Sequence, residues 1–244
     1  MTDMSLANKC ICTIRKELSR CSATGYADYW SKADTVKGGD EFIVFEDGLR
    51  RDIVAYIIVR YFFIFDAYIF GGFVASHHSG LPWNDIDIML VRPHDNFIEL
   101  LNNLPSFICM MTGLAKDAMS IKQSSQSAYG NKVELKVKYD EQFISIPIDL
   151  CFEWRLALIP WPPITVGSCL KMDKDGTSWR HIREPYPFSP LEQWCLSDII
   201  ALLKVGQDFR LEIEYPPGEL AYKKYLSSLA EKSKLWKLIG PTQN

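Results

Sequence analysis

The sequence lacks an apolar run long enough to cross a membrane. Its most apolar stretch, IVAYIIVRYFFIFDAYIF, is interrupted by Arg60 and Asp66. This stretch suits a buried helix followed by a strand better than a transmembrane helix. The first 20 residues also lack an apolar segment next to basic residues. We therefore expect neither a signal peptide nor a membrane partner.

Paired cysteine motifs are missing as well. The seven cysteines are an odd number, and no two of them have the CxxC spacing. Cys10, Cys12 and Cys21 cluster, but no second pair with zinc-ligand spacing follows them. We therefore expect free thiols in a reducing compartment, which predicts a cytoplasmic location.

The sequence also has no excess of positive charge. It contains 27 basic and 30 acidic residues, which gives a net charge of −3. Contact with nucleic acid therefore requires a local basic patch. One candidate is Lys136 in the alternating segment KVELKVKY, for which a solvated strand face is the ordinary alternative. A second candidate is a basic cluster around a tryptophan, formed by Lys171, Trp179, Arg180 and Arg183.

Hydrophobic periodicity predicts an α+β fold in three regions. Apolar residues recur at helical spacing in some segments and alternate in others. We expect helices over 6–20, 47–65, 73–80, 95–104, 191–205 and 219–239. We expect strands over 42–45, 67–70, 85–91, 132–139 and 143–152, and a hairpin over 166–184. The segment IPWPPITVG is the expected border of a C-terminal region. The predicted divisions are 1–45, 46–155 and 156–244.

The string GGDEF at positions 38–42 is the signature of diguanylate cyclases, which make a cyclic dinucleotide from GTP. Only 37 residues precede Gly38, and they favour a helix and a loop. No upstream strand supplies a metal-binding aspartate in this short segment. A five-residue match is weak evidence outside its structural context. We interpret GGDEF as a turn into a short strand with solvated acidic side chains.

A second Gly-Gly lies in more suggestive surroundings. Asp85 and Asp87 are two residues apart in a predicted strand, so their side chains lie on one face. Carboxylates are the usual protein ligands of magnesium, and a pair can serve two ions. Gly71-Gly72 leads into a short helix, so backbone N–H groups there can approach a triphosphate. Ser76 follows as a candidate phosphate donor.

A third carboxylate would complete such a site. Asp149 is a lone acid in the apolar strand SIPIDLCF, between Ile148 and Leu150. A buried carboxylate is costly without a cation. The sequence therefore predicts a site for two Mg²⁺ ions at Asp85, Asp87 and Asp149, with a nucleoside triphosphate as substrate.

Gly-Gly, twelve residues and then Asp-Ile-Asp-Ile resembles the head of the DNA polymerase β nucleotidyltransferase superfamily. The most similar pattern is GGxVRDxxxGxxxxDIDI, from tRNA CCA-adding enzymes and bacterial poly(A) polymerases. The positions that fall on it are Gly71, Gly72, Val74, Gly80, Asp85, Ile86, Asp87 and Ile88. Ala75-Ser76 stand where the family has Arg-Asp, so a basic group is missing here.

The resemblance implies a metal-dependent nucleotidyltransferase. It implies a head with a mixed sheet, here followed by a mainly helical C-terminal region. Asp85 and Asp87 would be metal ligands, Gly71 and Gly72 would contact the triphosphate, and Asp149 fits the third carboxylate of many members. The expected acceptor is an RNA 3′ end. Two alternatives stay open: a degenerate head that binds without catalysis, and a toxin-like or small-molecule-modifying transferase. A family-like head with an unfamiliar tail also suits a viral protein acting in the host cytoplasm.

Overall fold

The computed structural model describes residues 51–91, 97–126, 130–139, 141–153, 163–180, 194–211 and 219–240. The expected helix over 6–20, the strand over 42–45, the GGDEF string and Arg183 lie outside these ranges. None of the helices within them combines the length and the apolar character that crossing a bilayer requires.

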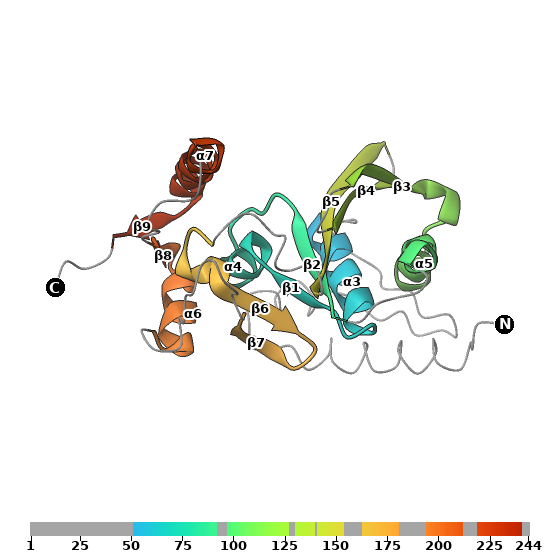
Figure 1. The fold of residues 1–244 in the computed structure, drawn as a ribbon. Coiled ribbons are helices and arrows are strands. Elements are labelled where there is room, and N and C mark those ends of the chain that lie inside the picture. Colours follow the sequence, from blue (N-terminus) through green and yellow to red (C-terminus); the bar gives the residue numbers. More distant parts are fainter. Residues whose placement is uncertain are drawn as a thin grey trace. The chain divides into compact units, whose positions relative to one another are not determined.

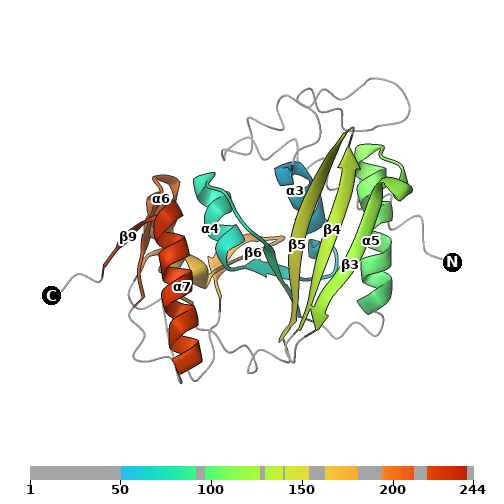
Figure 2. The same cartoon turned by 90° about the horizontal axis from the view of Figure 1, so that it is seen from above.

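In these ranges, seven strands form one mixed sheet in the order β3-β4-β5-β2-β1-β6-β7 (Figure 1). Strand β2 runs parallel to β5 and antiparallel to β1, which is also antiparallel to β6. Figure 2 shows β3, β4 and β5 side by side, as this order requires. The strands are β1 Tyr68–Phe70, β2 Ile86–Leu90, β3 Met119–Gln126, β4 Gly130–Tyr139, β5 Gln142–Phe152, β6 Leu170–Asp173 and β7 Gly176–Trp179.

A second, two-stranded sheet pairs β8 (Gln207–Phe209) with β9 (Lys237–Ile239) in parallel. Five α-helices occur in the described part of the chain. They are α3 Arg51–Phe63, α4 Gly72–Ser79, α5 Phe97–Thr112, α6 Leu196–Lys204 and α7 Glu219–Leu235. Two 3₁₀ turns, η1 (Lys116–Ala118) and η3 (Val166–Cys169), precede β3 and β6. The predicted α+β class with a mixed sheet is confirmed.

The chain divides into two compact units, and strands β3, β4 and β5 contribute residues to both. The first unit contains α3 and α5. Between these helices, the Tyr61 hydroxyl donates a hydrogen bond of 2.7 Å to the Leu100 carbonyl. The second unit contains β1, α4, β2 and the C-terminal elements, and it holds Asp85, Asp87 and Asp149.

The central strands form because their apolar side chains alternate with polar ones. Ile86 and Ile88 of β2 are fully buried, as are Ile148 and Leu150 of β5. Successive side chains in a strand point to opposite faces. Burying these four residues therefore directs Asp87 and Asp149 to the other face of the sheet.

Several element boundaries differ from those expected. Helix α5 continues through Pro105 to Thr112, so its expected end at Leu104 is wrong. The apolar stripe beyond the proline explains the continuation: Ile108 is fully buried and Met111 nearly so. Burial of this stripe outweighs the one hydrogen bond that a proline removes from a helix.

The C-terminal region also departs from expectation. Helix α6 begins at Leu196, and the preceding Trp194 and Cys195 are not helical. Helix α7 ends at Leu235 rather than Ile239, because the next residues pair with β8 as β9. Strand β3 was not expected. Its polar segment MSIKQSSQ has little apolar alternation, and most of its side chains are exposed.

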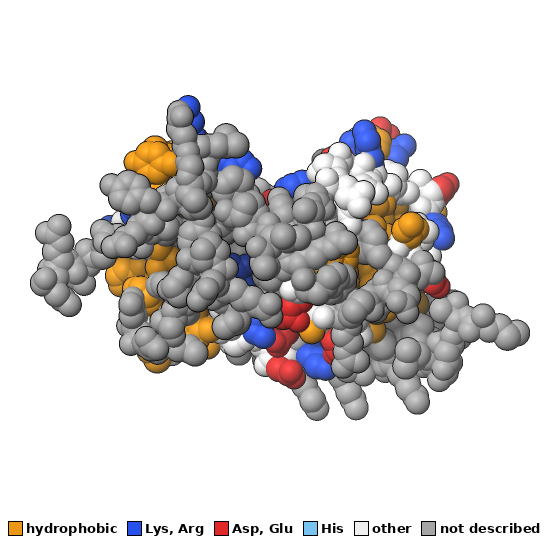
Figure 3. Space-filling view, viewed as in Figure 1, with side chains coloured by type: hydrophobic (Ala, Val, Ile, Leu, Met, Phe, Trp, Pro, Cys, Tyr) orange, Lys and Arg blue, Asp and Glu red, His pale blue; other side chains and the backbone are white. Residues whose placement is uncertain are grey.

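Exposed charges gather near the β6–β7 turn (Figure 3). There Lys174 Nζ lies 3.0 Å from Asp66 Oδ1, and Lys171 Nζ lies 3.6 Å from Asp173 Oδ2. Both pairs are partly open to solvent, so each contributes little to stability. The turn contains its own Asp-Lys-Asp string, at residues 173–175, away from the buried strands.

Candidate metal centre

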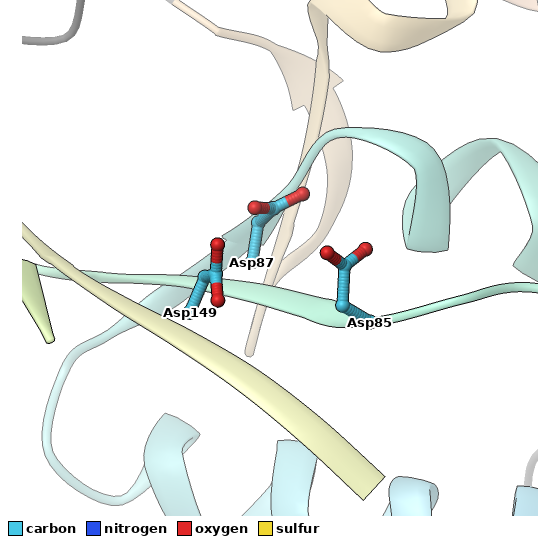
Figure 4. Close-up of side chains that lie close together, drawn as sticks. All are labelled: Asp85, Asp87 and Asp149. Carbon is cyan, nitrogen blue, oxygen red and sulfur yellow. The ribbon is translucent and has the colours of Figure 1, made fainter. Parts of the chain in front are cut away.

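Three carboxylates converge at one end of the paired strands β2 and β5. Asp85 lies directly before β2, Asp87 lies within it, and Asp149 is the register partner of Asp87 on β5. One carboxylate oxygen from each lies within 4.8 Å of the other two. Figure 4 shows the three side chains projecting to the same side of the strands. The expected convergence of these residues is therefore present.

The surroundings make these carboxylates costly to ionise together. Burial, followed by the charges of the neighbouring Asp85 and Asp149, raises the pKa of Asp87 to about 8. Burial also raises the pKa of Asp85, followed by the charge of Asp149. Carboxylates in such a cluster favour bound cations, because a cation compensates both desolvation and mutual repulsion.

One cation of the protein itself already contacts the cluster. The ammonium group of Lys132, on β4, forms an ion pair with Oδ2 of Asp149. The Lys132 side chain is 50% exposed and that of Asp149 is 17% exposed. The lysine therefore reaches the carboxylate from the solvent side. The sequence pattern showed Lys132 as one of several strand lysines, without this partner.

Gly71 brings the backbone against the metal-binding face. Its φ of 76° lies in the left-handed region, which disfavours residues with a side chain. An added Cβ at this position would collide with Oδ2 of Asp87. At Gly72, where α4 begins, an added Cβ would meet nothing within 4 Å. The turn thus combines a strict glycine requirement with open space beside the helix N-terminus.

A cavity of about 550 Å³ lies next to Asp85 in the same unit. Such a volume is within the range of small-molecule sites. Its wall includes Gly72 and Ser76 on one side and residues of helix α7 on the other. The lining residues used below are Trp83, Asn84, Asp85, Ser227, Ser228 and Lys232.

Lys232 is a cation in the wall of this cavity, and its charge interacts with Asp85 and Asp87. Burial lowers its pKa, whereas the charges of Asp208, Asp87 and Asp85 act in the opposite direction. Asp208 is itself buried and accepts a hydrogen bond of 2.8 Å from the backbone N–H of Gly167. The lysines of this last helix were expected to form an ordinary solvated face. For Lys232 that expectation is wrong.

The other predicted residues lie in varied places. Ser76 lines the cavity, but its hydroxyl donates to the Pro82 carbonyl at 3.1 Å. Lys136 is exposed on β4. Lys171 and Trp179 are partly buried on β6 and β7. Arg180, directly after β7, lies over the ring of Phe70.

Comparison with known proteins shows only distant similarity. No protein-family model and no curated protein matches the chain. A candidate nucleotidyltransferase from H. pylori has 11% identity and a TM-score of 0.34, over 45% of this chain and 47% of that protein. The apo form of a CCA-adding enzyme has 12% identity and a TM-score of 0.41, over 81% of this chain and 42% of that one.

A CCA-adding enzyme in complex with CTP is similar to the same degree. It has 11% identity and a TM-score of 0.39, over 79% of this chain and 40% of that one. The chain therefore spans about half or less of the length of these neighbours. Similarity at this level does not identify an activity.

Proposed function

We propose that this chain is a metal-dependent nucleotidyltransferase. It transfers a nucleotidyl group from a nucleoside triphosphate to an acceptor hydroxyl, with an RNA 3′ end as the acceptor. One observation carries the proposal: Asp85, Asp87 and Asp149 converge within 4.8 Å beside a glycine turn. Three carboxylates at this spacing suit a pair of divalent ions.

The chain's own residues divide the work. Asp85, Asp87 and Asp149 would hold the two Mg²⁺ ions, because their carboxylate oxygens lie close enough together. When bound, such a pair lowers the barrier by activating the acceptor hydroxyl and neutralising charge on the leaving pyrophosphate. The acceptor oxygen bonds to the α-phosphorus, the bond from that phosphorus to pyrophosphate breaks, and the hydroxyl proton leaves to solvent.

The triphosphate lies in the cavity beside Asp85. Gly72 lines it at the start of α4, where backbone N–H donors have no partners within the helix. Lys232 faces it from α7. Its partly buried ammonium group is less screened by water than that of a fully exposed lysine and attracts phosphate more strongly.

The proposal of RNA as the acceptor rests on exposed positive charge on β4. Lys136 is exposed on β4, the strand that also carries Lys132. Phosphate contacts of this kind position a nucleic acid without reading its sequence. We also propose the division into a head over 46–155 and a C-terminal region over 156–244.

Incorporation of labelled nucleotides tests the proposal. The protein, Mg²⁺ and a mixed RNA pool are incubated with each of the four labelled triphosphates. The Asp85→Asn/Asp87→Asn variant should lose all incorporation. Asp173→Asn/Asp175→Asn is the matched control, because it changes a surface Asp-x-Asp string with the same spacing. That control should retain full activity.

The outcomes separate the alternatives. Label on RNA from wild type and control alone supports the proposal, and the incorporated base gives the specificity. Label on protein or small molecules but not on RNA supports the toxin-like alternative. Nucleotide binding without any transfer supports a degenerate head that binds without catalysis.

A further inference from the structure

One face of the sheet carries a row of paired residues that starts at the metal centre. Asp149 pairs with Asp87, Asp87 with Phe70, Phe70 with Lys171, and Lys171 with Ser178. Directly opposed residues in a sheet present their side chains on the same face. The carboxylates and the basic residues of β6 and β7 therefore share one surface.

Arg180 lies at the glycine end of this surface. Its backbone N–H donates to the Cys169 carbonyl at 2.7 Å, which extends the β6–β7 pairing by one step beyond Trp179. Moving along β7 in this direction corresponds to moving along β1 from Phe70 toward Gly71 and Gly72. Arg180 is thus level with the turn that precedes α4.

The aromatic ring of Phe70 fixes the arginine side chain. The guanidinium carbon of Arg180 lies 4.5 Å from the centre of this ring, a cation–π distance. Phe70 is in turn the register partner of Asp87 on β2. The guanidinium therefore lies over Phe70, on the face of the sheet that also carries Asp87.

The guanidinium also contains a buried hydrogen-bond donor without a partner among the described residues, its Nε. It is the only buried side-chain nitrogen or oxygen without one in those ranges. A buried donor without a partner is costly and points to a ligand that completes it. A planar guanidinium matches phosphate oxygens in particular, because it donates in pairs.

We propose that Arg180 binds the triphosphate of the nucleotide, and so replaces from β7 the basic group that is absent at Ala75-Ser76. The inference rests on the proposed function and deepens it. The ligand recognised is the polyphosphate, whatever the base. The sequence pattern had grouped Arg180 with candidate nucleic-acid contacts. Its position over Phe70, the register partner of Asp87, instead favours the reacting nucleotide over a distant part of the acceptor.

A purely structural role makes a different prediction. If Arg180 only balanced the charge of Asp87, its removal would alter metal binding and stability but leave phosphate affinity unchanged. The two roles are therefore separated by measuring the affinities for polyphosphate and for the metal alone in the same variants.

The experiment uses isothermal titration calorimetry without an acceptor. Inorganic tripolyphosphate, AMP and each of the four nucleoside triphosphates are titrated with saturating Mg²⁺. The proteins are wild type, Arg180→Gln, Arg180→Lys and Lys174→Gln. The last is the charge-matched control, because Lys174 is an exposed residue of the β6–β7 turn. Mn²⁺ binding to each protein is followed separately by electron paramagnetic resonance.

We expect Arg180→Gln to bind tripolyphosphate and triphosphates about 10- to 100-fold more weakly than wild type. Its affinity for AMP should change by less. Arg180→Lys should be intermediate, because it keeps the charge but loses paired donation. Lys174→Gln should bind like wild type. The affinity of Arg180→Gln for Mn²⁺ should be unchanged or higher, since a neighbouring positive charge has been removed.

Three results would overturn the inference. Equal tripolyphosphate affinity in wild type and Arg180→Gln would mean that the arginine is only a counter-ion of Asp87. Nucleotide transfer by wild type would then still support the proposed function. If Arg180→Gln lost affinity for tripolyphosphate, AMP and Mn²⁺ to the same extent, Arg180 would only maintain the structure of the site. No triphosphate binding by wild type, despite Mn²⁺ binding, would reject both the inference and the proposed function.

Discussion

Replacing Asp87 by asparagine should stabilise the metal-free protein at alkaline pH. The native pKa of this carboxyl is about 8, whereas its ordinary value is 3.8. Between these two pH values the folded state keeps a proton that the unfolded state has lost. The free energy of unfolding therefore falls as pH rises through this window, and the loss is complete above the native pKa.

The magnitude follows from the distance between the two pKa values. The native pKa lies about 4 units higher, and each unit corresponds to about 1.4 kcal/mol, so the upper limit is about 6 kcal/mol. Asp87 is partly accessible to solvent. Water screens part of the repulsion, so we expect a gain of about 2–3 kcal/mol in Asp87→Asn at pH 9. At pH 5, only about one unit above the ordinary value of 3.8, the difference between the two proteins should be much smaller.

Urea unfolding in EDTA at pH 5, 7 and 9 measures this difference. Added Mg²⁺ should restore stability to wild type at pH 9 but much less to the variant, because the metal binds only an intact carboxylate cluster. Asp175→Asn, at an exposed carboxylate, is the control and should show no pH-dependent gain. A variant no more stable than wild type at pH 9 would refute the claim that Asp87 carries a desolvated, repelled charge.

The remaining predictions concern the residues around the carboxylates. Gly71→Ala should lower the melting temperature and abolish nucleotide binding, because the backbone has a positive φ there and the added Cβ would collide with Asp87. Gly72→Ala should melt like wild type and lose only triphosphate affinity, because its Cβ meets no protein atom. Calorimetry and circular dichroism distinguish the two variants, and equal melting losses would contradict the assignment. Lys132→Met should raise Mn²⁺ affinity several-fold in paramagnetic resonance, because it frees a carboxylate; weaker binding would make the lysine part of the site. Lys232→Met should weaken triphosphate binding about tenfold in calorimetry. Lys224→Met, at an exposed residue of α7 that is not among those lining the cavity, should not.

The core of the candidate site could be predicted because its signals are local. Asp85 and Asp87 share a strand face by spacing alone, and the two fully buried isoleucines between and after them fix which face that is. Asp149 was recognisable as a single acid in an apolar strand. Its pairing with Asp87 followed from strand register, which the sequence only suggested.

The cations around the site could not be predicted in the same way. Lys132 lies on β4, Arg180 follows β7 and Lys232 lies on α7, so each reaches the carboxylates through tertiary packing. In the sequence each of these residues belongs to a group of similar basic residues, and no local feature distinguishes it from the others. For the same reason β3 was missed, since its pairing partner, rather than its own pattern, makes it a strand.

These three cations also bear on how the site takes up its metal. Each lowers the pKa of at least one of the two aspartates of the Asp-Ile-Asp-Ile segment. Even so, the pKa of Asp87 stays near 8. The protein's own positive charges therefore do not fully compensate the carboxylates, and a divalent ion that bound at neutral pH would displace a proton. Since Arg180 and Lys232 also suit phosphate, the charge balance favours joint binding of metal and triphosphate over binding of free metal alone.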